Sequence, residues 1–427
     1  MQDVAIIAGV VLVYGFGSEM LARRWITGPM FFVAAGIVLG DAGLKWFEFS
    51  AGNEGVQRLA EATLVLVLFA DATRIDLKAL ANGWRLPARL LGIGFPLTVM
   101  AGILLGVAVL GLKWQEAGLL AAVLTPTDAA LGAAVVTDER LPVRIRQALN
   151  VESGLNDGLA VPVVAVFGAL VLSETAGFGS GLVGEALTEL ALGVLWGVGL
   201  GCGGGFLLRF AAERKWAEPI WQQLSTLSIA VLAFTGADLI GGNGFVAAFT
   251  AGLAFGQIAG RHCTGIQNFT IDFGEGLAGA TFAVFGAIIA GPALDRVTWE
   301  ILLYSLLSLT LVRMIPVSIS MLGSHVRFHT RLFLGWFGPR GLASIVFGLL
   351  VLENSAEPSS SQPLFDVVAW TVLLSIVLHG LTAQPFARAL ADELNAMEDE
   401  HPDMPEHEVV PEMPVRVRPA QRINLST

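Results

Sequence analysis

The sequence has 427 residues, of which 54% are hydrophobic and only 14% are charged, and its mean hydropathy is +0.69. These values exclude an ordinary soluble globular domain. The formal net charge of −11 does not point to a cationic or nucleic-acid partner, because much of the acid lies between Glu398 and Glu412. Cys202 and Cys263 are far apart and the six histidines lack metal-ligand spacing, so we expect no disulfide framework, cofactor or bound transition metal.

Apolar stretches recur along the chain, each long enough to cross a hydrocarbon core about 30 Å thick. The first stretch lacks the basic leader and cleavage site of a signal peptide, so we expect a retained helix. The sequence therefore predicts an all-α polytopic membrane protein with about thirteen transmembrane helices. Glycine, proline and charged residues mark the boundaries of these segments, which lie near 4–20, 28–44, 56–73, 89–111, 115–136, 146–172, 182–209, 220–237, 243–259, 273–291, 299–322, 332–352 and 366–388.

The distribution of basic residues predicts the orientation of the chain. With the amino terminus outside, most loop arginines and lysines, among them Arg74, Arg144 and Arg146, lie in cytoplasmic loops or at cytoplasmic helix ends. This is what the positive-inside rule requires, and it predicts a multi-pass inner-membrane protein with a cytoplasmic carboxyl terminus. The final stretch, 391–427, is rich in Glu, Pro and Arg, so we expect a disordered tail.

Two of the predicted segments contain helix breakers. An odd segment count allows two inverted six-helix repeats, the first six and the last six segments, with the seventh as connector. The fifth segment is interrupted at Thr125-Pro126-Thr127-Asp128 and the twelfth at Gly338-Pro339-Arg340-Gly341. These positions correspond in the two repeats, so we expect two broken helices whose unwound peptide groups meet near the membrane centre.

Few ionisable residues lie near the middle of the predicted segments. A charge at the bilayer centre costs about 2.5 to 3.5 kcal/mol, so each should face a partner or an aqueous path. Some of these residues could serve only to hold helices together. The set is Asp71, Asp128, Glu152, Asp157, Arg313 and Arg340.

Helical spacing separates the residues of the sixth segment by role. Ser153, Asn156 and Asp157 stand at i, i+3 and i+4, so they share one face and can offer oxygens to one small cation. Glu152 points about 140° away from Asp157, which suits a structural ion pair with Arg313 or Arg340. Asp157 is therefore the central candidate for ion binding.

Other residues near the breaks could complete this site. Thr127 can add a hydroxyl or carbonyl oxygen, and Asp71 can orient the ligands or supply a further oxygen. Asp128 could instead neutralise the ends of the broken helices. We expect the cation at Asp157, Ser153, Thr127 and Asp71.

A single carboxylate in such a site predicts coupled exchange. A cation and a proton need the same oxygens of Asp157, so binding of one expels the other. Asn156 is neutral and Arg313 stays charged, so one acid titrates on this face, which predicts one proton per monovalent cation and no net charge moved. The oxygen-only ligands suit an alkali cation without choosing between sodium and potassium.

These residues resemble the cation/proton antiporter family of bacterial and archaeal sodium/proton exchangers, kin of the animal exchangers. The family's Glu-Ser-x-x-Asn-Asp motif stands here as Glu152 to Asp157, and its Thr-Asp motif as Thr127-Asp128. Further similarities are Leu68-Phe69-Ala70-Asp71, Leu311-Val312-Arg313, whose arginine pairs with the motif glutamate, Gly338-Pro339-Arg340-Gly341 and His379-Gly380-Leu381-Thr382. Two departures are Ala129, where the family often has proline, and Asp71, where glutamate is common.

The resemblance also implies a domain organisation. It implies a homodimer and a transmembrane antiporter domain over 1–390. Within it, scaffold helices over about 1–88 and 182–291 hold the dimer interface, and a mobile core covers about 89–172 and 299–390. Such a protein is a transporter and not an enzyme.

Three alternatives use similar features. A sodium-coupled symporter could carry a small organic anion with Arg340 on the carboxylate. An intramembrane aspartyl protease also needs paired acids, but Tyr14 and Tyr304 lie away from the acids and its motifs are missing. A passive channel would conduct without a pH gradient.

Overall fold

The computed structural model describes residues 2–47, 53–176, 181–259, 264–353, 358–398 and 404–414. Every regular element in these ranges is helical. The helices are α1 Gln2–Arg23, α2 Gly28–Leu39, α3 Glu54–Thr73, α4 Leu77–Gly83, α5 Arg85–Arg89, α6 Phe95–Leu110, α7 Trp114–Leu124, α8 Ala129–Val136, α9 Val143–Ala176, α10 Leu182–Glu213, α11 Pro219–Leu239, α12 Gly244–Ala259, α13 Thr264–Phe285, α14 Gly291–Ala293, α15 Trp299–Leu309, α16 Leu311–Ser320, α17 Phe328–Trp336, α18 Leu342–Glu353 and α19 Pro358–Glu398. Short π or 3-10 turns η1 Leu90–Gly94, η3 Gly286–Ala290, η4 Leu294–Arg296 and η5 Pro405–His407 complete the list.

Many of these helices are long and apolar enough to cross a membrane. By length and composition, seven spans qualify in the described part of the chain, or eight if the bent pair α7 and α8 is one span. This is fewer than the thirteen predicted, in part because α2, α12 and α18 are shorter than a full crossing. The all-helical membrane fold is confirmed.

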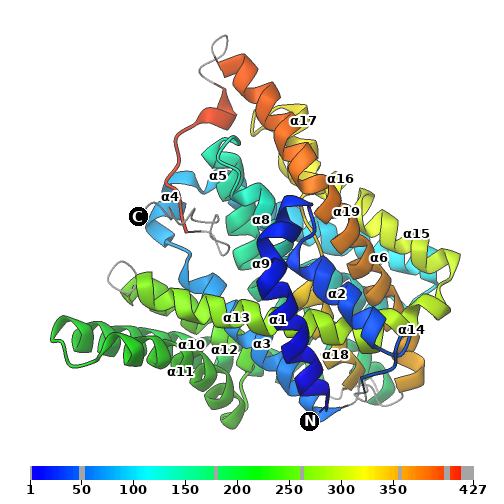
Figure 1. The fold of residues 1–427 in the computed structure, drawn as a ribbon, viewed down its shortest axis with the longest axis horizontal. Coiled ribbons are helices and arrows are strands. Elements are labelled where there is room, and N and C mark those ends of the chain that lie inside the picture. The colour runs from blue at the N-terminus through cyan, green and yellow to red at the C-terminus, as the bar shows by residue number, and fades with distance from the viewer. Residues whose placement is uncertain are drawn as a thin grey trace.

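The helices form two groups in space. Figure 1 shows α10 to α12 on one side of the molecule, α15, α16 and α19 on the other, and α18 between them. Gly193, Gly197 and Gly201 stand four residues apart on α10, and an added Cβ at any of them would collide with the backbone of α12 or the loop before it. Small residues at this spacing let two membrane helices approach closely.

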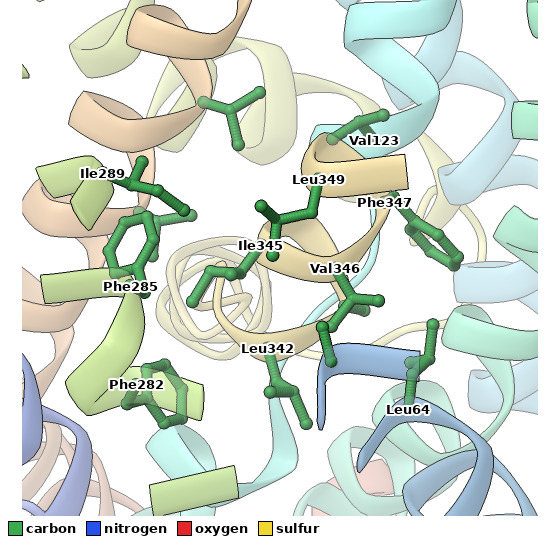
Figure 2. Close-up of a cluster of buried hydrophobic side chains, with 14 of the residues drawn as sticks. Leu64, Val123, Phe282, Phe285, Ile289, Leu342, Ile345, Val346, Phe347 and Leu349 are labelled. Atoms are coloured by element: carbon green, nitrogen blue, oxygen red, sulfur yellow. The ribbon is translucent and has the colours of Figure 1, made fainter. Parts of the chain in front are cut away.

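The short helix α18 lies inside the protein. Figure 2 shows its apolar side chains packed among those of α3, α7 and α13, with Ile345 and Val346 near the centre. A broken helix can be tolerated at membrane depth only where its backbone is shielded from lipid. The packing around α18 provides that shielding.

The carboxyl-terminal part of the chain differs from the disordered tail expected after residue 390. Helix α19 continues to Glu398, and Leu390, Ala391 and Leu394 are buried in one apolar cluster with Leu141 and Ile145. Residues 404–414, here called the strap, also pack on the molecule, and Met404, Val410 and Met413 are buried there. Figure 1 shows the strap in red, beside α4 and α5.

Candidate ion-binding site

The two helix breaks meet inside the protein. Helices α7 and α8 are bent by 45° around residues 125–128, and α17 and α18 are separated by residues 337–341. The Asp128 amide donates a hydrogen bond of 2.7 Å to the Pro339 carbonyl. Proline at each break removes a helical donor, so the helix does not continue regularly through the break.

Asp128 caps two half-helices at once. Its Oδ1 accepts hydrogen bonds from the amides of Ala130 at 2.7 Å and Leu131 at 3.2 Å, at the start of α8. Its Oδ2 accepts one from the amide of Leu342 at 2.8 Å, at the start of α18. One carboxylate therefore compensates the positive ends of both helices. Gly341 permits this contact, because a Cβ there would collide with the Asp128 carboxylate.

Arg340 compensates the negative, carboxyl-terminal end of α7 at the first break. Its guanidinium is fully buried, and Nη1 donates to the Thr125 carbonyl at 2.8 Å and to the Pro126 carbonyl at 3.4 Å. These carbonyls lie just beyond the carboxyl-terminal end of α7, where the helix dipole is negative. The Arg340 amide donates to Ser375 Oγ at 2.6 Å, which ties the second break to α19.

Glu152 and Arg313 form a buried ion pair between α9 and α16. Arg313 Nη1 lies 2.8 Å from Glu152 Oε1, and Nη2 donates to Oε2 at 2.9 Å. Both side chains are at most 5% exposed, so each would be an uncompensated charge without the other. Gly338 leaves room for the arginine, because a Cβ there would collide with the guanidinium.

A cluster of polar side chains joins the first break to α9. Thr127 Oγ1 lies 3.0 Å from Ser153 Oγ, and Asn156 Nδ2 donates to Thr127 Oγ1 at 2.6 Å. Asn156 Oδ1 is buried and accepts no hydrogen bond from the part of the chain described here. Asp157, the next residue on α9, is 7% exposed. Such uncharged and carboxylate oxygens are the ligands that alkali cations prefer.

Asp71 lies beside this face but has a cationic partner on its own helix. It forms a buried ion pair with Arg74, three residues further on at the end of α3. Arg74 stands at the carboxyl-terminal cap of α3 and is only 6% exposed, because the i, i+3 spacing lets it reach Asp71. A Cβ at Gly154 would lie 3.9 Å from the Asp71 carbonyl, so the backbone of α3 approaches α9 there.

His379 and Ser375 of α19 contribute buried polar groups whose role the sequence did not predict. His379 Nε2 lies 2.9 Å from the Trp336 carbonyl at the end of α17, and Nδ1 lies 3.0 Å from the Ser375 carbonyl. His379 and Ser375 are both buried. The available signal was a histidine within a long apolar segment, four residues after a serine that could share its helix face.

A small cavity adjoins the polar cluster. Its volume is about 10 Å³, close to the minimum for one water molecule. Ser153 and Asn150 of α9 line it together with Gly132 of α8 and Pro339 of the second break. The polar cluster thus borders a space about the size of one water molecule. Asn150, which lines this space, also contacts the strap.

Comparisons with known proteins agree with this arrangement. Residues 6–389 match the family described as "Sodium/hydrogen exchanger, transmembrane". The chain is 24% identical over 399 residues to the K(+)/H(+) antiporter NhaP of Alkalimonas amylolytica, covering 91% of this chain and 67% of that protein. It is 26% identical over 392 residues to the Na(+)/H(+) antiporter 2 of Zygosaccharomyces rouxii, covering 81% of this chain and 47% of that protein.

The fold is also similar to a solved structure. The sodium proton antiporter MjNhaP1 from Methanocaldococcus jannaschii superposes with a TM-score of 0.74 at 19% identity, covering 92% of this chain and 99% of that one. The chain spans about two thirds of the bacterial relative and about half of the yeast one. Since the family match extends over most of the chain, the protein belongs to the sodium/hydrogen exchanger family of multi-pass membrane transporters.

Proposed function

We propose that this protein is a secondary active antiporter that exchanges Na⁺ or K⁺ for H⁺ across the inner membrane. The observation that carries the proposal is the hydrogen-bonded cluster of Thr127, Ser153 and Asn156 at a helix break, next to the buried Asp157. The names of the relatives include both sodium and potassium antiporters, so both cations belong in the proposal.

Competition for Asp157 couples the two fluxes. The cation binds the ionised carboxylate together with the oxygens of Ser153 and Thr127, with Asp71 as a further neighbour. Protonation of Asp157 removes the negative charge that holds the cation, so each ion displaces the other. With one titrating carboxylate, the exchange is one for one and electroneutral.

Alternating access requires the site to open to each side in turn. We assign thirteen spans in two inverted six-helix repeats, with the amino terminus outside and the carboxyl terminus in the cytoplasm. The core, about 89–172 and 299–390, then moves against a scaffold of about 1–88 and 182–291, which forms a homodimer. Asp128 and Arg340 support this scheme, because they hold the two breaks together as one rigid crossing.

The test is cation-driven proton movement in proteoliposomes containing a pH-sensitive dye. Sodium, potassium and lithium are added in turn. In the sodium and lithium experiments, the membrane potential is also clamped with potassium and valinomycin, and the rates with and without the clamp are compared. We expect a pH change with at least one cation, unaffected by voltage. A voltage-dependent rate would contradict the one-for-one stoichiometry, and conduction without counter-transport would indicate a channel.

Asp157→Asn is the decisive variant. It keeps the side-chain volume but removes the titrating group, so exchange should fall to the level of protein-free liposomes. Asp41→Asn is the matched control, because Asp41 is exposed in a turn and should leave the rate unchanged. Wild-type exchange by Asp157→Asn would refute the proposed mechanism. Uptake of a labelled organic acid driven by sodium would favour the symporter instead.

A further inference from the structure

The strap, residues 404–414, is anchored to two helices that build the candidate site. Glu406 is fully buried, and its Oε1 accepts hydrogen bonds from the Arg327 amide at 2.7 Å and from Thr330 Oγ1 at 3.0 Å, at the start of α17. Glu408 lies 2.7 Å from Arg144 and Glu412 lies 2.6 Å from Arg146, on the first turn of α9. The strap thus ties α9 to the first half of the second broken helix.

The charges at the start of α9 favour this contact. Arg144 and Arg146 place two cations at the positive end of the α9 dipole, an unfavourable position for positive charge. Their side chains are only 8% exposed. The strap glutamates bring negative charge to the same helix end, so binding of the strap relieves the unfavourable interaction of the arginines with the helix dipole.

The last residues of the strap bind to α9 close to the candidate ion site. Met413 and Gln147 form two hydrogen bonds, from the Met413 amide to Gln147 Oε1 at 3.1 Å and from Gln147 Nε2 to the Met413 carbonyl at 3.3 Å. Asn150, one turn further along α9, donates to the Pro414 carbonyl at 3.2 Å. Asn150 also lines the small cavity beside Ser153, so the strap contacts a wall of that cavity.

The other edge of the strap is not closely packed. An open cavity of about 870 Å³ separates residues 404–409 from the neighbouring surface, and Arg89 of α5 and His325 lie in its wall. Val409 is 95% exposed. Apart from the buried side chains of Met404, Val410 and Met413, the strap is therefore fixed by hydrogen bonds and ion pairs, and its release exposes no large apolar core.

We propose that the strap is an autoinhibitory segment that closes the cytoplasmic path to the ion site. Bound, it holds α9 and α17 together and keeps Asn150 over the cavity beside Ser153. Released, it lets the cavity open to the cytoplasm and lets the core move. This inference rests on the proposed antiport function and on the cytoplasmic assignment of the carboxyl terminus.

The first experiment measures access to the cavity independently of transport. Gly132→Cys, in a Cys202→Ser/Cys263→Ser background, places a thiol in the cavity wall, where an added Cβ meets open space. The rate of labelling by a membrane-impermeant methanethiosulfonate is compared with and without Glu408→Gln/Glu412→Gln. Loss of the two ion pairs should raise the labelling rate by about 2- to 30-fold. Val409→Ser is the matched control in the strap and should leave the rate unchanged.

The second experiment locks the strap reversibly. Gln147→Cys/Met413→Cys in the same background is joined by a short bifunctional thiol reagent and released by reduction, and exchange is measured in both states. We expect exchange to stop when the strap is joined and to recover on reduction. Equal rates in both states, together with unchanged labelling of the Gly132→Cys thiol in the Glu408→Gln/Glu412→Gln variant, would overturn the proposal. Absence of exchange in the unmodified protein would instead count against the antiport function.

Discussion

Each buried charge at the two breaks is matched by a group from a different helix. Glu152 of α9 meets Arg313 of α16, Asp128 meets the amide at the start of α18, and Arg340 meets the carbonyls after α7. This pairing leaves the Ser153 and Asn156 face of α9 lined by uncharged oxygens. On α9 the structural charge of Glu152 thus points about 140° away from the candidate ion-binding carboxylate of Asp157.

At the residue scale, Glu152→Gln should destabilise the protein more than it impairs transport. It leaves Arg313 buried without its counter-charge, which costs about 3–5 kcal/mol. The melting temperature in detergent should fall, and Glu152→Gln/Arg313→Gln should recover part of the loss. A melting temperature equal to that of the wild type would mean that the ion pair contributes nothing to stability.

Thr127→Val should weaken cation binding and leave the fold intact. The substitution keeps the shape but removes the hydroxyl shared by Ser153 and Asn156. Loss of one hydrogen-bonding group costs about 1–2 kcal/mol, so the KM for the cation should rise about 5- to 30-fold. Thr63→Val, at a buried hydroxyl pair between α3 and α13, is the control, and an unchanged KM in Thr127→Val would exclude the hydroxyl as a ligand.

At the element scale, the broken helices act as a single unit because their ends share Asp128 and Arg340. The half-helices α8 and α18 are short, with 8 and 12 residues, and gain little stability alone. Their starting amides both depend on the Asp128 carboxylate. A substitution at one break should therefore alter the stability of the other.

Gly341→Ala tests this dependence. The added Cβ would displace the Asp128 carboxylate, so we expect lower thermal stability and reduced exchange. Gly132→Ala, in α8 of the same crossing, is the control, because its Cβ meets open space. Equal melting temperatures for the two variants would show that the crossing tolerates a displaced cap.

At the scale of the whole molecule, the proposed mechanism needs the core to move against the scaffold. Gly380 of α19, in the core, lies against Met30 of α2, in the scaffold, since a Cβ at Gly380 would meet the methionine side chain. Thr63 and Thr281 touch within the scaffold, where their hydroxyl oxygens lie 2.9 Å apart. The two pairs offer a comparison between a contact that should break during transport and one that should persist.

Cross-linking these pairs gives the prediction. In a background of Cys202→Ser/Cys263→Ser, oxidised Gly380→Cys/Met30→Cys should stop exchange, and reduction should restore it. Oxidised Thr63→Cys/Thr281→Cys should retain exchange near its reduced rate. Full activity with the first pair joined would contradict relative movement of the two groups at that contact.

From the sequence alone follow the membrane class, the all-helical fold and the two helix breaks. These follow from local chemistry, since hydropathy, proline and glycine act within a few residues of where they stand. The shared face of Ser153, Asn156 and Asp157 on α9, and the angle of about 140° between Glu152 and Asp157, also follow from helical periodicity. The family resemblance named the same residues.

Which groups from distant segments meet is seen only in the folded protein. The tertiary structure joined Asp128 to the amide of Leu342 and brought His379 to the end of α17. It also placed residues 404–414 on α9, although their composition resembles a disordered tail. The physical reason is that these contacts join segments whose partners are set by packing, which no local pattern of hydropathy or charge can specify.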